Sequence, residues 1–103
     1  MRRGYQIIER NYRTRWGELD LIAYDGQTLA FCEVKTRRSG GLKGGPFDAL
    51  GPAKQAQVRR MAGRWLHERR DRPRAAVVRF DAIGVVLDGR GRLLALEHLE
   101  GAF

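Results

Sequence analysis

The dipeptide Asp25-Gly26 constrains the fold most strongly, because it stands between two runs of strand-forming residues, 18–24 and 28–36. Asp-Gly readily adopts the positive φ angles of a tight turn and is the strongest short signal for a hairpin. The sequence therefore predicts an antiparallel hairpin over residues 18–36, joined by a two-residue turn. Since side chains alternate along a strand, each strand presents one set of residues to each face.

Acidic residues gather on one face of this predicted hairpin. A two-residue turn places Asp20 opposite Phe31 and Glu18 opposite Glu33. Asp20 and Glu33 are then diagonal neighbours, with side chains roughly 7 Å apart at their bases. Lys35 lies on the same face, two residues beyond Glu33. Two carboxylates at this separation can converge on one cation.

Like charges on neighbouring strands cost energy unless a cation or a proton compensates them. A Mg²⁺ or Mn²⁺ ion held by Asp20, Glu33 and Glu18 is the natural compensator, since carboxylates, waters and substrate phosphates are its usual ligands. The ammonium of Lys35 is then placed to orient a water or to stabilise charge on a phosphate. The alternative is a solvated strand face, because Glu-x-Lys alone is a weak signal. The other face is suited to a core, with Leu19, Leu21, Ala23, Cys32 and Val34.

The remaining pattern predicts one mixed α/β domain over residues 1–103, with a central sheet flanked by helix in the order β-β-β-α-β-β. The further predicted strands are residues 5–13, 75–87 and 93–96. A helix is predicted from Pro52 to about Arg69, because proline suits the first helical turn. Apolar residues at i, i+3, i+4 and i+7 predict one buried stripe on it: Val58, Met61, Ala62 and Trp65.

The charge balance predicts the kind of partner. Twenty Lys and Arg residues oppose twelve Asp and Glu residues, which gives a net charge of +8. This excess favours nucleic acid first and an anionic membrane surface second, with a solubilising charge as the alternative. The single cysteine, Cys32, excludes an internal disulfide and favours a reducing, cytoplasmic setting. No apolar run approaches the roughly 20 residues of a membrane span, so we expect no membrane partner.

Residues 37–45 form a basic, glycine-rich segment that directly follows the strand carrying Glu33. We predict that this segment contacts substrate, with Arg37, Arg38 and Lys43 on phosphates, and a plain linker is the alternative. It is not a P-loop, because Lys43 is followed by glycine rather than by the serine or threonine that this motif needs.

Three further features of the sequence are candidates for the site. Lys54 extends the apolar stripe of the predicted helix, so we predict that it contacts phosphate or a carboxylate. The alternative is a lysine whose stem packs while its head reaches water. Asp81 stands within a predicted strand, where a structural salt bridge with Arg79 or another arginine is favoured over a role in the site. Tyr12 and Trp16 are candidates for stacking on bases.

Two segments, Gly17-Glu18-Leu19-Asp20-Leu21-Ile22-Ala23 and Phe31-Cys32-Glu33-Val34-Lys35-Thr36-Arg37, resemble the YraN-like family of uncharacterised bacterial proteins. That family in turn resembles the PD-(D/E)XK nuclease superfamily, and Holliday-junction resolvases in particular. The likeness continues through Lys54, Arg79-Phe80-Asp81 and Ala102-Phe103, and covers essentially the whole chain. It implies a restriction-endonuclease-like fold in which Asp20 and Glu33 bind the metal and Lys35 assists catalysis.

The resemblance also predicts an element that this sequence does not contain. Members of the family begin with a further helix that carries a Gly-Glu pair, and an additional site acid is implied there. This chain starts at Met1-Arg2-Arg3-Gly4-Tyr5, where that helix should have ended. Either the start is trimmed or misassigned, or the fold lacks the family's N-terminal helix.

The resulting hypothesis is a Mg²⁺- or Mn²⁺-dependent endonuclease-like protein that binds DNA and hydrolyses phosphodiester bonds. Branched or damaged DNA is the candidate substrate, and a homodimer is the candidate assembly. The first alternative is a nucleic-acid-binding module that kept the fold without turnover. The second is a protein-interaction scaffold with a basic surface, which needs neither metal nor nucleic acid.

Overall fold

The computed structural model describes residues 4–38 and 51–103 of the chain. Within these ranges the elements follow the chain order β-β-β-α-β-β, as the sequence predicts. The strands are β1 (Gln6–Thr14), β2 (Gly17–Tyr24), β3 (Thr28–Arg38), β4 (Val77–Leu87) and β5 (Leu93–Leu99), and the helix is α1 (Pro52–Glu68). The predicted bounds of β3, α1 and β4 agree with these to within two residues, whereas β5 continues three residues further than predicted.

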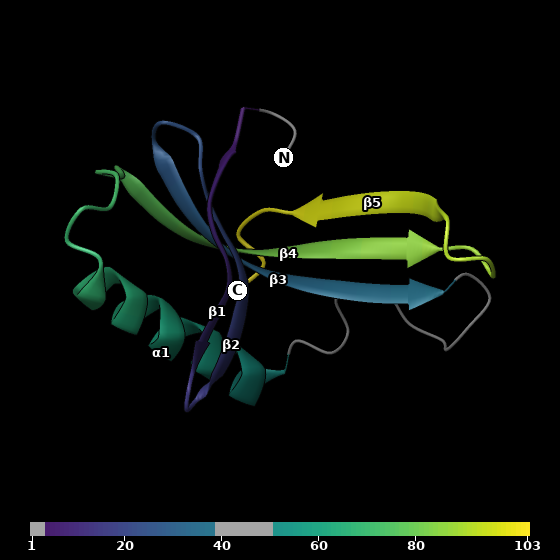
Figure 1. The fold of residues 1–103 in the computed structure, drawn as a ribbon, viewed down its shortest axis with the longest axis horizontal. Coiled ribbons are helices and arrows are strands. Elements are labelled where there is room, and N and C mark those ends of the chain that lie inside the picture. The colour runs from purple at the N-terminus through teal and green to yellow at the C-terminus, as the bar shows by residue number, and fades with distance from the viewer. Residues whose placement is uncertain (1–3, 39–50) are drawn as a thin grey trace.

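The strands form one mixed sheet in the spatial order β1-β2-β3-β4-β5. Neighbouring strands are antiparallel except β3 and β4, which are parallel. A parallel pair needs a long crossover connection, and α1 lies within the crossover from β3 to β4. In Figure 1, α1 lies across β1 and β2, while β5 and the far halves of β3 and β4 extend beyond it as an arm. The predicted α/β class is therefore confirmed.

The turn between β2 and β3 differs from the predicted two-residue turn. Tyr24 pairs with Leu29, so four residues rather than two lie between the paired positions that flank the turn. The Oδ1 atom of Asp25 accepts hydrogen bonds from the backbone N–H groups of Gln27 at 2.9 Å and Thr28 at 2.7 Å. Aspartate side chains commonly mimic a backbone turn in this way, and here that local bonding stabilises the longer loop. The predicted register is therefore wrong by two residues.

A two-residue shift keeps the paired residues of β2 and β3 on their predicted faces but changes their cross-strand neighbours. The last pair of the β2–β3 ladder is Leu21 with Cys32, so the ladder ends before Asp20 and Glu33. Phe31 pairs with Ile22 and not with Asp20, as the predicted two-residue turn required.

The main core lies between α1 and the sheet. Phe31 packs edge-on against Trp65, with ring centroids 5.7 Å apart, and stacks on Phe80 of β4 at 5.8 Å. The helix buries the four residues of the predicted stripe: Val58, Met61, Ala62 and Trp65. Within the described part of the chain, no helix has the length and apolar character that crossing a membrane requires.

The prediction of which face of the hairpin is buried was wrong in part. The main core under the helix contains Leu19, which was predicted to be buried, together with Ile22 and Phe31 from the predicted carboxylate face. Glu33 of that face also contacts the helix, through Lys54. The predicted core residues Ala23 and Cys32 instead belong to a second, smaller cluster: Tyr5, Ala23, Ala30, Cys32 and Ile83. The sheet buries apolar residues on both faces, and the site lies where the helix interface ends rather than on an open strand face.

Candidate functional site

Three elements meet at the carboxylates. Asp20 comes from β2, Glu33 from β3, and Lys54 from the first turn of α1, which begins at Pro52. The ammonium nitrogen of Lys54 lies 3.3 Å from Oε1 of Glu33. Glu33 is buried, with 4% of its surface exposed, although it is an acid. The structure therefore brings together three of the residues that the sequence singles out, including the helix lysine.

Asp20 is held in place by the neighbouring strand. Its Oδ2 atom accepts a hydrogen bond of 2.8 Å from the backbone N–H of Val34. This bond is made just beyond the point where the β2–β3 ladder stops at Leu21 and Cys32. The carboxylate thus satisfies a backbone donor of β3 and is fixed beside Glu33.

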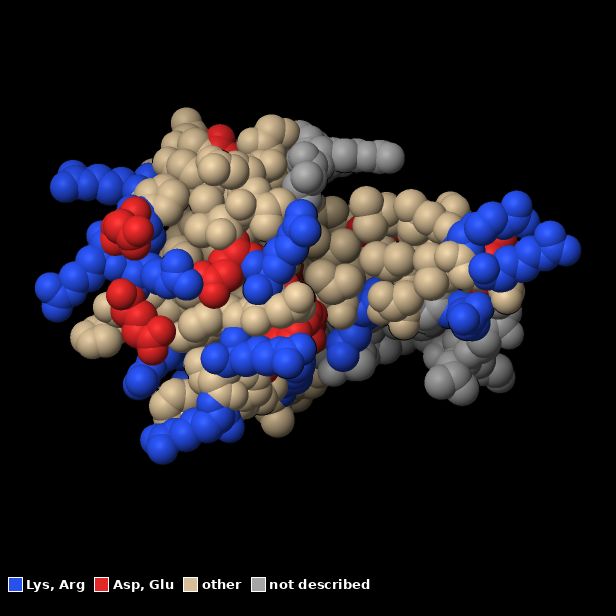
Figure 2. All heavy atoms as spheres, in the orientation of Figure 1, with Lys and Arg blue, Asp and Glu red and all other residues tan. Residues whose placement is uncertain are grey.

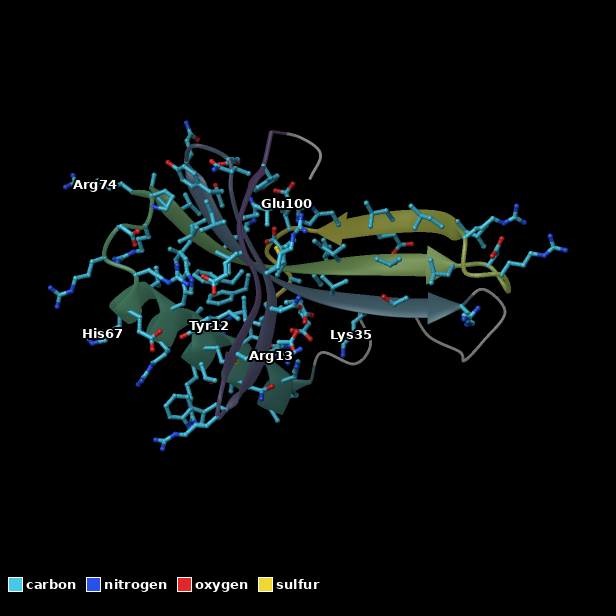
Figure 3. The ribbon with its side chains drawn as sticks, in the orientation of Figure 1. Tyr12, Arg13, Lys35, His67, Arg74 and Glu100 are labelled. Atoms are coloured by element: carbon cyan, nitrogen blue, oxygen red, sulfur yellow. The ribbon has the colours of Figure 1, made fainter. Side chains whose placement is uncertain are left out.

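Burial and like charge both act on Glu33. Burial raises the pKa of Glu33, and the neighbouring charge of Asp20 raises it further, whereas Lys54 and Lys35 lower it. The net pKa lies above the usual value, so the ionised pair is short of positive charge. Figure 3 shows Lys35 leaving β3 on the side of the strand where α1 begins.

One oxygen of Glu33 is unsatisfied. Oε2 is buried and has no hydrogen-bond partner among the described residues. A buried polar atom without a partner costs about 1–3 kcal/mol, and such atoms are rare in folded proteins. The atom is therefore a position where a cation or a donor from outside the chain would stabilise the fold.

Glu18 forms an ion pair with a residue of the neighbouring strand. Its Oε2 accepts a hydrogen bond of 3.0 Å from Nε of Arg13, across the β1–β2 hairpin. Accordingly, the described residues contain no group of three or more His, Cys, Asp or Glu that could hold a metal ion. The arrangement offers Asp20 and Glu33 as a two-carboxylate donor set. Such a set fits Mg²⁺ or Mn²⁺, which bind through one or two carboxylates and retain waters and phosphate oxygens as further ligands.

The predicted phosphate contacts are only partly described. Arg38 is exposed, and its guanidinium contacts the carbonyl oxygens of Asp88 and Gly89 at 3.4 and 3.3 Å, in the β4–β5 turn. The side chain of Arg37 and all of Lys43 lie outside the described part of the chain. Figure 2 shows Lys and Arg side chains gathered over β1, β2 and α1, with a further group at the tip of the β3-β4-β5 arm.

Gln57 is a residue of the site region that the sequence analysis missed. It lies three residues after Lys54 on α1, and its side-chain Nε2 donates a hydrogen bond to the carbonyl oxygen of Trp16. The residue after Trp16 is Gly17, which has a φ of +141°. A Cβ atom at Gly17 would overlap the side-chain amide of Gln57. The helical spacing from Lys54 is the one sequence signal for Gln57. This contact fixes the start of β2, which carries Asp20, against the helix.

Asp81 belongs to a separate polar cluster, as the sequence predicts. Arg79 binds it with two hydrogen bonds, of 2.7 Å from Nε and 2.8 Å from a terminal nitrogen. His98 contacts Oδ2 at 2.7 Å, and the backbone N–H of Gly101 donates to Oδ1 at 3.0 Å. The guanidinium of Arg79 also donates to the hydroxyl of Tyr5. These contacts tie β4 to β5 and to the chain start, and they satisfy Asp81 without any outside ligand.

Comparison with known proteins identifies similar chains. The model of a family described as "Uncharacterised protein family UPF0102" matches residues 1–85. A UPF0102 protein of Streptomyces griseus subsp. griseus is 47% identical over 98 residues, which cover 95% of this chain and 80% of the relative. Those of Parafrankia sp. and Rhodococcus opacus are 45% and 43% identical over 100 residues, covering 97% of this chain and 81% of each relative. Their names state no activity, substrate or cofactor.

Proposed function

The chain belongs to the UPF0102 family, the YraN-like family that its motifs resemble, and we propose that it is a metal-dependent nuclease-like protein that binds DNA. The observation that carries the proposal is the buried, unpartnered Oε2 of Glu33. This oxygen lies in a carboxylate whose neighbour is the fixed carboxylate of Asp20. A divalent cation between the two would satisfy the oxygen and neutralise the pair.

Asp20 and Glu33 would hold the cation, and each is positioned before it binds. The bond from Val34 fixes Asp20, and the ion pair with Lys54 fixes Glu33. A bound Mg²⁺ or Mn²⁺ supplies polarisation of a phosphate and acidification of a water. Preorganised ligands of this kind need little rearrangement when a charged substrate arrives, which is the property that catalysis requires.

The lysines supply positive charge on both sides of Glu33. Lys35 follows Glu33 on the same face of β3 and would hold an attacking water or stabilise the charge on the phosphate. Lys54 neutralises part of the carboxylate charge from the helix side. Its half-buried ammonium is also within the range of a phosphate that approaches the pair, so it is a candidate substrate contact. The set of two acids and one strand lysine supports a restriction-endonuclease-like assignment of the fold.

A cleavage assay tests this function. The protein is incubated with plasmid, single-stranded and branched DNA, in Mn²⁺, in Mg²⁺ and in EDTA. We expect metal-dependent cleavage that Asp20→Asn and Glu33→Gln abolish. The matched control is Glu97→Gln on β5, which removes an exposed strand glutamate outside the site and is expected to retain full activity. Absence of cleavage by the unmodified protein, or equal cleavage by the Asp20→Asn variant, would refute the nuclease.

A non-catalytic DNA-binding module is the second candidate, and two ion pairs favour it. The ammonium of Lys54 neutralises part of the charge of Glu33, and Glu18 is paired with Arg13. In this alternative the carboxylates and Lys54 are a structural ion cluster. DNA binding in EDTA that persists in the Asp20→Asn variant, without cleavage in any metal, is the result that this candidate predicts.

A further inference from the structure

Trp16 stands in the turn between β1 and β2, half-buried and surrounded by arginines. The guanidinium carbon of Arg15 lies 4.6 Å from the centre of the indole ring, and that of Arg64 lies 5.5 Å from it. The indole borders two hollows. The first has a volume of about 460 Å³ and is lined by Arg13, Thr14, Arg15, Trp16, Arg64 and Glu68. The second has a volume of about 260 Å³ and is lined by Trp16, Ala53, Ala56, Gln57 and Arg60.

Part of the positive charge around the indole is uncompensated. Arg13 is paired with Glu18, and Arg64 is paired with Glu68. Within the described part of the chain, Arg15 and Arg60 form no ion pair. Arg15 lines the first hollow, and Arg60 lines the second. An aromatic ring in contact with Arg15, with Arg60 lining a hollow that the same tryptophan borders, matches a ligand with a flat ring and flanking anions.

The backbone of Trp16 is fixed from both sides. Its N–H donates to the hydroxyl of Thr14 at 3.1 Å, and its carbonyl oxygen accepts from the amide of Gln57. Gly17, which follows, leaves the space that the Gln57 amide fills. The backbone that carries the indole is therefore held against α1, which lowers the cost of ordering this turn when a ligand stacks on the ring.

We propose that Trp16, with Arg15 and Arg60, binds an unpaired nucleotide of a nucleic acid. The base stacks on the indole, where it replaces a guanidinium, and the arginines contact the adjoining phosphates. Stacking on an aromatic side chain needs an exposed base face, which single strands offer and paired duplex does not. This inference rests on the proposed function and names its preferred substrate as DNA with an unpaired segment.

Trp16 is linked through α1 and β2 to the elements that carry the candidate metal site. Gln57, which holds Trp16, lies three residues after Lys54, a rise of about 4.5 Å along α1. Trp16 also directly precedes β2, the strand that carries Asp20. Asp20 lies four residues beyond Trp16, about 13 Å of extended strand, so a DNA strand held on the indole would reach the candidate metal site only through further nucleotides. A junction between paired and unpaired DNA offers such a strand.

Fluorescence anisotropy with labelled oligothymidine and with a duplex of equal length tests the proposal at low salt. EDTA is present throughout, so the result is independent of whether the protein cleaves DNA. Trp16→Ala is expected to weaken single-strand binding between about fivefold and about a hundredfold, the loss that one base stack produces. Trp16→Phe keeps an aromatic face and is expected to retain most of the affinity. A plot of the logarithm of the binding constant against the logarithm of the salt concentration has a negative slope. Arg15→Gln and Arg60→Gln are each expected to reduce the magnitude of this slope by roughly 0.7 for single-stranded DNA.

Matched controls remove similar groups at the far end of the sheet. Leu94→Ala deletes a large apolar side chain that is 56% exposed on β5, and Arg90→Gln deletes an exposed charge in the β4–β5 turn. We expect Leu94→Ala to bind like the unmodified protein and Arg90→Gln to change the salt slope less than Arg60→Gln. Equal binding by the Trp16→Ala and Leu94→Ala variants overturns the proposal, as does equal loss on single strand and duplex.

Intrinsic fluorescence gives a readout that needs no destabilising variant. Trp65 is 1% exposed in the core, so its emission is a nearly constant background. Oligothymidine is expected to quench the emission of Trp16 in the unmodified protein, and the quenching is expected to vanish in Trp16→Phe. Binding without any quenching contradicts stacking. Quenching without cleavage in any metal supports the nucleotide site while refuting the nuclease, so the two proposals fail separately.

Discussion

The ammonium of Lys54 lies 3.3 Å from a carboxylate oxygen of the buried Glu33, so the first turn of α1 closes one side of the Asp20–Glu33 pair. This contact joins the crossover helix to the strand that the crossover leaves. It places a cation next to the one buried acid whose other oxygen has no partner among the described residues. The helix therefore covers the core and also supplies a positive charge, that of Lys54, next to Glu33.

Replacement of Lys54 by methionine is expected to lower the free energy of unfolding by about 1–2 kcal/mol. Breaking a fully buried ion pair costs about 3–5 kcal/mol, and the loss is smaller here because the Lys54 side chain is 30% exposed. Urea unfolding at neutral pH measures the change. In a Glu33→Gln background the same substitution is expected to cost much less, because the charge that Lys54 neutralises is gone. Equal losses in both backgrounds would show that the ion pair contributes nothing.

Asp81 is expected to control the stability of the fold in acid. Burial raises the pKa of Asp81, but hydrogen bonds from Arg79 and from the Gly101 backbone, and the contact with His98, outweigh it, so the net pKa lies below the ordinary 3.8. An acid with a lowered pKa in the folded state contributes stability above its unfolded pKa and loses it as the pH falls through the folded pKa. Asp81→Asn is therefore expected to destabilise the protein at pH 7 by about 3–5 kcal/mol.

The matching measurement is urea unfolding at a series of pH values from 7 to below 3. The free energy of unfolding of the unmodified protein is expected to fall steeply as the pH drops below the ordinary pKa of Asp81. For the Asp81→Asn variant, the free energy of unfolding is expected to fall less steeply over the same pH range. Asp71→Asn is the control, because Asp71 is exposed and lies outside the cluster. The prediction is contradicted if the free energies of unfolding of the Asp81→Asn variant and of the unmodified protein fall equally steeply with pH in acid.

Cys32 is expected to be chemically silent in the folded protein. Burial raises the pKa of the thiol to about 12, and the charge of Asp81 acts in the same direction. Because the thiolate is the reactive form, iodoacetamide should modify Cys32 only when the protein unfolds. Mass spectrometry with and without urea measures the rate. Fast labelling of the native protein contradicts the burial of Cys32, and slow labelling provides a check of folding for every variant above.

Gly17→Ala is expected to destabilise the start of β2 by about 1–3 kcal/mol, through a φ of +141° and through overlap with the Gln57 amide. Gln57→Ala removes the overlap but not the backbone strain. Thermal unfolding of the single variants and the double variant separates the two causes. The double variant should be more stable than the sum of the single losses predicts. Strict additivity is the outcome that argues against a steric contact.

The sequence predicts much of the fold because the signals are local. The element order follows from runs of strand-forming residues and from the spacing of Val58, Met61, Ala62 and Trp65, which all become buried. A salt bridge from Asp81 to an arginine is likewise predicted, and the structure identifies the arginine as Arg79, two residues earlier on the same strand.

The remaining features depend on contacts that the sequence does not display. The side chain of Asp25 bonds to two backbone N–H groups in the longer turn, and Phe31 pairs with Ile22 rather than with Asp20. Glu18 shares a face with the carboxylates by alternation, but Arg13 of β1 pairs with it. That partner can be identified only once the pairing of β1 with β2 is known.

Titration of Mn²⁺ into the metal-free protein by calorimetry tests most directly whether Asp20 and Glu33 form a metal site. We expect one bound ion per chain, and loss of this binding in both Asp20→Asn and Glu33→Gln. Glu97→Gln should bind as the unmodified protein does, because Glu97 lies on β5 outside the pair. Glu18→Gln should also retain binding, since Glu18 is paired with Arg13. Absence of Mn²⁺ binding, or binding that survives Glu33→Gln unchanged, would contradict a metal site at this carboxylate pair.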